Sequence, residues 1–319
     1  MRYFCTLFDK NYLIKGLSMI KSLIKNCKNV KVFVLCIDND TKIILDKLKI
    51  NRIHTIQLKD IEDKELIAAK NNRTRTEYCW TLASSFTWYV MNKFDEIDLI
   101  TYLDADLLFY SKVEPIFKEI NNASIAIIEH RFANPFKELE VNGRFCVEWN
   151  SFKRDKEGLK CLNKWRKQCL DWCYYKLEND KMGDQKYLDK WPKEYSSCHI
   201  IMNEGAGIAP WNYSQYKIAL KSNQIQINDS KLIFYHFHQF QIISEKNFFR
   251  VSKIYTKVAK EPQIIYKIYE EEIRDSLKQI RLIDPNFEAG IGLNNNTFLK
   301  RKMQQLLPRK IKNFIRKFL

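Results

Sequence analysis

Hydrophobic residues in the first hundred positions follow two alternating spacings. Short apolar runs with side chains at consecutive or alternate positions predict β-strands. These runs cover residues 3–8, 30–37, 53–58 and 98–103. Between them, apolar residues recur every three or four positions, which predicts helices. The helical segments are 12–25, 60–69 and 76–93. Strands that alternate with helices in this way predict an α/β fold with a largely parallel sheet and right-handed crossovers.

The second half of the chain has a less regular pattern. Strands are expected at 124–129, 196–202 and 231–235. An amphipathic helix is expected at 155–175, with Leu159, Leu162, Trp165, Cys169, Trp172 and Cys173 on one face. Residues 241–283 are expected to be mainly helical.

Two carboxylates follow the strand at 98–103, in the segment Asp104-Ala105-Asp106. In an open α/β sheet, ligands bind beyond the carboxyl ends of the strands. Two acids placed there repel each other and lose solvation unless a cation lies between them. A hard divalent ion such as Mn²⁺ or Mg²⁺ takes oxygen ligands and bridges to phosphates. We therefore predict that Asp104 and Asp106 bind a metal, with Ala105 in the same ligand-binding turn; the alternative is a solvated turn.

The sequence around these acids resembles a known family. Residues 100–117, ITYLDADLLFYSKVEPIF, resemble the core of GT-A nucleotide-sugar transferases. The whole layout is similar to glycosyltransferase family 8 and its bacterial relatives. Further segments carry the likeness: the opening strand, loop and helix at 5–23, and residues 181–188, 205–212 and 234–238. The resemblance covers about residues 1–240.

The resemblance implies a GT-A, Rossmann-like fold with a mixed, mostly parallel sheet flanked by helices. It implies a catalytic domain at 1–240, a helical region at 241–293 packed on it, and a basic tail at 294–319 after a linker. The implied activity is metal-dependent transfer of a sugar from a nucleotide diphosphate, with UDP expected, to a glycan or lipid-linked acceptor. It also implies retention of the anomeric configuration.

The loop after the first strand of such a sheet faces the nucleotide crevice. Thr6 and Asp9 are therefore expected to hydrogen-bond the base or ribose, and Tyr12 to stack on the base. The alternative for Tyr12 is packing on the helix below. Arg73 and Arg75 precede the helix that leads to the acidic strand, and charge-assisted hydrogen bonds would suit them to a diphosphate.

The structural alternative for Arg73 and Arg75 is a solvated loop in which Thr76 caps the helix.

A second candidate segment is Asp184-Gln185, which follows a glycine in a polar loop. In the related family this dipeptide lies beside the donor sugar and the acceptor, so the pair is the candidate catalytic site. Asp184 would orient an acceptor hydroxyl or act in acid–base chemistry. The alternative is an N-cap for a short helix at 185–190.

His236 and His238 end another apolar strand, two residues apart, so both are expected on one side. Imidazole is a common ligand for borderline metals such as Mn²⁺. In family 8 a histidine after such a strand completes the metal site, and His236 is the closer match. The Gly and Lys-Pro-Trp that follow in that family are missing here, so no diphosphate contact is carried over from that loop.

One segment departs from the related pattern of an aromatic residue followed by Asn-x-Gly. Here the chain reads Phe145-Cys146-Val147-Glu148, with Cys and Glu in place of Asn and Gly. Because this region is expected to touch the sugar, Glu148 is a candidate replacement contact. The departure also keeps open a catalytically inactive scaffold.

Charge is concentrated at the end of the chain. The net charge is +16, and eight of the cations lie beyond residue 289, where no acid occurs. Apolar residues at 311, 314, 315, 318 and 319 follow helical spacing beside these cations. This predicts a basic amphipathic helix on an anionic membrane surface, or docked on the main domain. A nucleic-acid binder would instead interleave basic and aromatic residues along a groove, so no nucleic-acid partner is expected.

Two remaining features concern location and the competing enzyme class. No run of 18 apolar residues occurs, and the nine cysteines have irregular spacing, so we expect a cytoplasmic protein with reduced cysteines, peripheral on the inner face of the membrane. A sugar nucleotidyltransferase is the alternative enzyme of related fold. It would carry a glycine-rich basic loop after the first strand, where this chain has Asp9-Lys10-Asn11-Tyr12.

Overall fold

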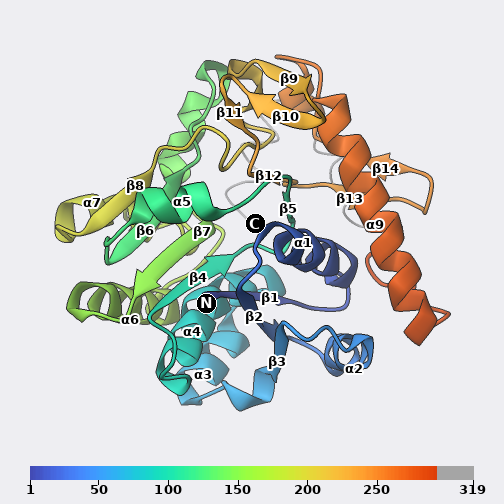
Figure 1. The fold of residues 1–319 in the computed structure, drawn as a ribbon. Coiled ribbons are helices and arrows are strands. Elements are labelled where there is room, and N and C mark those ends of the chain that lie inside the picture. The colour runs from blue at the N-terminus through green and yellow to red at the C-terminus, as the bar shows by residue number, and fades with distance from the viewer. Residues whose placement is uncertain (293–319) are drawn as a thin grey trace, which may run out of the picture.

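A computed structural model describes residues 1–292 (Figure 1). The predicted tail at 294–319 and its linker lie outside the described residues. A seven-stranded sheet forms the centre of the molecule, in the order β3-β2-β1-β4-β7-β6-β8. Its strands are β1 (Arg2–Phe8), β2 (Val30–Cys36), β3 (Ile53–Gln57), β4 (Leu99–Leu103), β6 (Ile125–Glu129), β7 (Phe145–Lys153) and β8 (Cys198–Ile201).

The sheet is mixed but mostly parallel, as predicted. Strand β1 pairs in parallel with β2 and β4, β2 with β3, and β6 with β8. Strand β7 alone among these seven runs antiparallel to its neighbours, β4 and β6. The carboxyl ends of β1 and β4 therefore meet at one edge, where the chain leaves β4 into Asp104.

Helices cover both faces of this sheet (Figure 1). One core contains residues of α3 (Lys64–Asn72), α4 (Arg75–Lys93), α6 (Lys156–Asp171) and α7 (Trp191–Glu194). The other contains residues of α1 (Leu13–Asn26), α2 (Asn39–Leu48), α5 (Glu114–Ile120) and α9 (Gln263–Ile283). Side chains alternate between the two faces of β1, so this strand contributes to both cores. Phe4 and Phe8 lie in the core with α1, α2, α5 and α9, and Cys5 and Leu7 lie in the core with α3, α4, α6 and α7.

Small sheets and short turns complete the structure. Strand β5 (Leu107–Phe109) pairs antiparallel with β12 (Phe234–His236), and β9 (Ile218–Lys221), β10 (Gln224–Ile227) and β11 (Ser230–Lys231) form a three-stranded sheet. The remaining elements are η1 (Leu58–Asp60), η2 (Asn134–Asn142), η3 (Lys186–Lys190), η4 (Tyr213–Gln215), β13 (Gln241–Ile242), β14 (Phe248–Phe249) and α8 (Lys253–Thr256). Long α9 packs against α1 and α2.

Two predicted helical regions differ from the structure in extent. Residues 241–283 are mainly helical, as predicted, through α8 and α9, but β13 and β14 form a hairpin before these helices. A turn at 244–247 sets this hairpin, in which Ser244 Oγ accepts from the N–H of Asn247 (3.2 Å). The predicted helix at 155–175 ends at Asp171, so Trp172 and Cys173 lie beyond it.

The cysteine prediction was confirmed: all nine cysteines are free, and seven are buried. Within residues 1–292, no helix is long and apolar enough to cross a membrane.

Candidate active site

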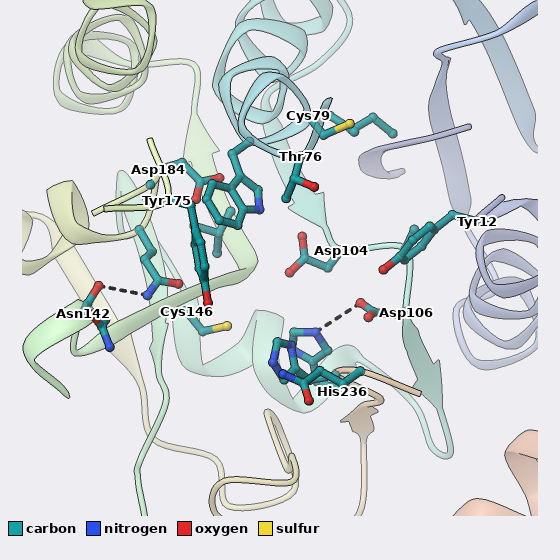
Figure 2. Close-up of a pocket in the computed structure, with 18 of the residues that line it drawn as sticks. Tyr12, Thr76, Cys79, Asp104, Asp106, Asn142, Cys146, Tyr175, Asp184 and His236 are labelled. Atoms are coloured by element: carbon teal, nitrogen blue, oxygen red, sulfur yellow. Dashed lines mark hydrogen bonds and ion pairs between the residues drawn. The ribbon is translucent and has the colours of Figure 1, made fainter. Parts of the chain in front are cut away.

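A cavity of about 590 Å³ opens at the carboxyl ends of β1 and β4. The loop after β1, the start of α4, the turn after β4, strand β7 and the segments around 184 and 236 all line it. Ten of the twelve predicted site residues reach this cavity: Asp9, Tyr12, Arg75, Asp104, Ala105, Asp106, Asp184, Gln185, His236 and His238. Residues far apart in the sequence thus share one pocket (Figure 2).

Thr6 and Arg73 do not line this pocket. Thr6 is fully buried in β1, and its hydroxyl has no hydrogen-bond partner. Arg73 points instead to the end of α6, where its guanidinium donates to the carbonyls of Cys169 (3.0 Å) and Leu170 (2.8 Å). These carbonyls lie in the last turn of α6, where backbone carbonyls have no N–H donor within the helix. The negative end of the helix dipole also stabilises a cation at this position. Arg73 therefore has a structural partner away from the pocket.

The β1–α1 loop presents Asp9 and Tyr12 to the cavity. One Asp9 oxygen accepts from the N–H groups of Asn11 (2.9 Å) and Tyr12 (3.1 Å), and the other is ion-paired with Arg75. The Tyr12 side chain is half-exposed and lies on the cavity wall (Figure 2). Arg75 is the first residue of α4.

The cap of α4 is not the one expected. Thr74 accepts from the N–H of Glu77, whose carboxylate accepts from Thr74 in return, so this pair forms the capping box. Thr76 lies in the first turn of the helix and lines the cavity (Figure 2).

Pairing between β5 and β12 brings His236 beside the acidic turn. Leu107 is opposite His236 in the ladder, and the N–H of Phe237 donates to the carbonyl of Asp106 (2.8 Å). The imidazole Nε2 of His236 then lies 3.1 Å from Asp106 Oδ1 (Figure 2). Both side chains are buried.

The two aspartates of this cluster have pKa values shifted in opposite directions. Burial raises the pKa of Asp104 to about 7, with the charges of Asp106 and Glu148 adding to the effect and that of His236 opposing it. Burial would also raise the pKa of Asp106, but the charge and hydrogen bond of His236 lower it below its usual range. The pKa of His236 is raised well above its usual value, because contacts with Asp106, Cys146 and Glu148 outweigh the effect of burial.

Glu148 was predicted to contact the sugar, but it lies behind His236 and outside the cavity. Its side chain is 0% exposed and does not line the cavity. Glu148 Oε2 is 2.6 Å from His236 Nδ1, whereas Oε1 has no hydrogen-bond partner. Gly207, at φ +71°, permits this approach, because a Cβ there would lie 2.8 Å from Glu148 Oε1. Cys146, two residues earlier on the same face of β7, does line the cavity.

The donor atoms of this cluster fit a divalent cation. One ligand atom each from Asp104, Cys146 and His236 lie within 4.8 Å of one another. Asp106 adds a second carboxylate next to His236. His238 also lines the cavity, with its ring 5.9 Å from that of His236, but it is not in this close group. Of the four predicted metal ligands, Asp104 and His236 belong to the close group, Asp106 contacts His236 beside it, and His238 lies outside it.

Asp184 lies across the cavity from Tyr12 and Asp106 (Figure 2), and Gln185 also lines the cavity. Asp184 is 6% exposed, and burial, reinforced by the charge of Asp104, raises its pKa well above the usual value. Gln185 Nε2 donates to the carbonyl of Asn142 (2.9 Å). Helix η3 begins at Lys186 with Gln185 as its N-cap residue, and no side chain caps it. The N-cap alternative for Asp184 is therefore wrong.

Several pocket residues carry no clear signal in the sequence. Trp80 and Tyr175 pair their rings at 5.6 Å, and Trp211 packs edge-on against His236 at 5.2 Å. Buried Lys15 donates to the carbonyl of Phe240 (2.7 Å), and its charge helps to lower the pKa of Asp106. The one available clue to Lys15 is its place among the apolar positions of the α1 helical pattern.

Comparison with known proteins agrees with this geometry. Two proteins of Bacillus subtilis (strain 168) are similar over nearly their whole length. Uncharacterized protein YfnD is 32% identical over 293 residues, covering 90% of this chain and 94% of its own. Uncharacterized protein YfnF is 30% identical over 301 residues, covering 92% and 98%.

A crystal structure of an active-site mutant of LgtC shares the fold, with a TM-score of 0.52 at 12% identity, over 81% of this chain and 95% of that one. This likeness confirms the predicted GT-A fold. Residues 5–189 match the family described as Glycosyl transferase family 8. The chain therefore belongs to glycosyl transferase family 8.

Proposed function

We propose that this glycosyltransferase depends on a divalent cation and transfers a sugar from a UDP-sugar to a glycan or lipid-linked acceptor. Family membership establishes the enzyme class and a nucleotide-sugar donor. The observation that carries the finer proposal is the convergence of Asp104, Asp106 and His236 on one wall of a cavity whose other walls carry Asp9, Tyr12 and Asp184.

Asp9, Tyr12 and Arg75 form the proposed nucleotide subsite. The Asp9 carboxylate accepts hydrogen bonds, which suits the imide N–H of uracil, and the exposed Tyr12 ring offers a stacking surface. Arg75 is ion-paired with Asp9 and is well placed to pair with a phosphate instead. Its side chain is largely exposed, so this exchange of partners requires only a rotamer change.

Asp104, Asp106 and His236 are the proposed holders of Mn²⁺ or Mg²⁺. Such an ion, when bound, neutralises charge that develops on the leaving diphosphate. Asp104 and Asp106 lie in the turn between β4 and β5, and His236 ends β12, which pairs with β5, so the backbone ladder fixes their spacing. Lys15 compensates part of their negative charge from behind.

Asp184 and Gln185 are the proposed residues beside the reacting centre. Burial raises the pKa of the Asp184 carboxyl well above its usual value, and in its protonated form this carboxyl can donate a hydrogen bond to a sugar oxygen. Gln185 is held by the carbonyl of Asn142 through its amide nitrogen, which leaves its amide oxygen to accept from a hydroxyl. Together they position sugar and acceptor, and positioning supplies much of the rate in such bimolecular transfers.

A donor screen tests the proposal. Hydrolysis of UDP-, GDP-, CMP- and dTDP-sugars is measured with Mn²⁺, with Mg²⁺ and with chelator, and thermal shift reports binding of each donor. We expect hydrolysis and stabilisation with a UDP-sugar only when a divalent ion is present. Equal turnover in chelator, or a preference for another nucleotide, contradicts the corresponding part of the proposal.

The basic tail supports a second, separate proposal, that residues 300–319 bring the enzyme to anionic membranes. Each Lys or Arg near such a surface contributes about 1 kcal/mol, and an apolar stripe adds burial. Vesicle co-sedimentation of the full chain and of a truncation ending at Asn296 tests this, at low and high salt. Equal binding by both proteins contradicts it, as does loss of donor hydrolysis on truncation.

A further inference from the structure

Cys146 is the one cysteine of the described chain whose sulfur lies within 4.8 Å of both a carboxylate oxygen and an imidazole nitrogen in a group that could hold a metal ion. We propose that its thiolate is a direct ligand of the cation, beside Asp104 and His236, so that the site prefers thiophilic divalent ions such as Co²⁺ and Zn²⁺ over Mg²⁺. This inference rests on the proposed metal-dependent function of the same pocket and adds a ligand and a metal preference to it.

The spacing of the donor atoms supports a shared ion. Sulfur and nitrogen bind Zn²⁺ at about 2.3 and 2.0 Å, so two tetrahedral ligands on one ion lie roughly 3.5 Å apart. The donor atoms of Asp104, Cys146 and His236 are all within 4.8 Å of one another. Rotamer adjustments of the order of one ångström close this difference. Asp106 Oδ1 lies 3.1 Å from His236 Nε2, beside this group, and would offer a second carboxylate.

Backbone hydrogen bonds between β7, β4 and the acidic turn hold the three donor residues in place. Cys146 is 4% exposed and lies on β7, which pairs with β4 immediately before Asp104. The N–H of Asp104 donates to the carbonyl of Glu148 (3.4 Å), so the acidic turn is fixed to the same strand. The donors therefore come from segments that hydrogen bonds between backbones tie together.

Glu148 supports the same site by contacting the other ring nitrogen of His236. A metal-bound histidine commonly donates its other ring N–H to a carboxylate, which fixes the tautomer and makes the ring a better ligand. Here Nδ1 contacts buried Glu148 Oε2 at 2.6 Å, which turns Nε2 toward Asp106. The substitutions Cys146 and Glu148, which depart together from the related family's pattern, thus act on the same ion: one as ligand, the other behind a ligand.

The chemical consequence is selectivity. Mg²⁺ favours oxygen ligands, whereas thiolate favours softer ions. Coordination releases the thiol proton to solvent and leaves a sulfur–metal bond. Co²⁺ is the practical probe, because a thiolate bound to it gives a ligand-to-metal charge-transfer band in the near ultraviolet.

The experiment adds Co²⁺ alone to the full chain, without nucleotide, while absorption and calorimetry are recorded. We expect one Co²⁺ per chain and a charge-transfer band. Cys146→Ser should lose the band and at least about tenfold in Co²⁺ affinity, with little change for Mg²⁺. Cys79→Ser is the matched control, since Cys79 lines the same cavity outside the donor group, and it should keep both.

The outcomes separate the two proposals. Calorimetric Co²⁺ binding without a band in the parent protein overturns the Cys146 ligand but leaves the metal site standing. A band that persists in Cys146→Ser, or disappears in Cys79→Ser, overturns it as well. Absence of Co²⁺ binding overturns this inference, whereas the donor screen with and without chelator decides the proposed metal dependence. Melting curves check folding, and Cys146→Ala repeats the test if the serine variant is unstable.

Discussion

Replacing Glu148 with Gln removes one charge behind the proposed metal site and almost no volume. In the structure, Glu148 Oε2 contacts His236 Nδ1 at 2.6 Å, and neither group is open to solvent. Losing a carboxylate partner of a ligating histidine typically costs 10- to 100-fold in metal affinity. Glu148→Gln should therefore weaken Mn²⁺ binding by about 1.4–2.8 kcal/mol, since every tenfold is about 1.4 kcal/mol.

Stability of the metal-free protein should respond much less. The variant loses a hydrogen bond between charged groups, worth about 1.5–3 kcal/mol. The buried position of Oε1, which has no partner, stays unsatisfied in the amide, but a neutral amide does not carry the cost of burying a carboxylate charge. Because the lost charge assistance and the relieved burial of charge have opposite sign, the melting temperature should change little while the affinity falls.

Calorimetric titration of Mn²⁺ in the presence of UDP measures the effect. Glu119→Gln is the control, because it breaks another carboxylate–imidazole contact, His199 Nε2 to Glu119 Oε1 at 3.0 Å, outside the cavity. The control should bind Mn²⁺ like the parent. An unchanged affinity in Glu148→Gln, or an equal loss in both variants, would refute the role given to Glu148.

Four further predictions have distinct expected outcomes. Asp106→Asn should nearly abolish turnover without unfolding the protein, measured by donor hydrolysis and melting; a variant that turns over like the parent, with or without chelator, would contradict it. His236→Ala should weaken Mn²⁺-dependent UDP binding more than His238→Ala in calorimetry, because His236 belongs to the close donor group and His238 does not. Asp184→Asn should lower kcat by a larger factor than it raises the donor Kd. Arg73→Ala should cost about 1–3 kcal/mol of stability in denaturant unfolding, with unchanged KM.

Local patterns along the chain determine the scaffold. Alternation along residues 3–8 places Phe4 on one face of the sheet and Cys5 on the other, and the fold buries both. The position of Asp104 and Asp106 follows from the end of β4, because parallel strands in such sheets present their carboxyl ends to the ligand. These features depend on residues close in sequence, so spacing alone is sufficient to predict them.

Pairings between distant segments are decided only by the tertiary structure. The partner of Arg73 is the end of α6, about a hundred residues away, and no local signal distinguishes that site from a phosphate. The likeness to related sequences predicts that Glu148 touches the sugar. In the folded protein, β7 turns it behind His236, 88 positions later. Whether a polar side chain meets ligand or protein depends on which strands become neighbours, and long-range packing decides that.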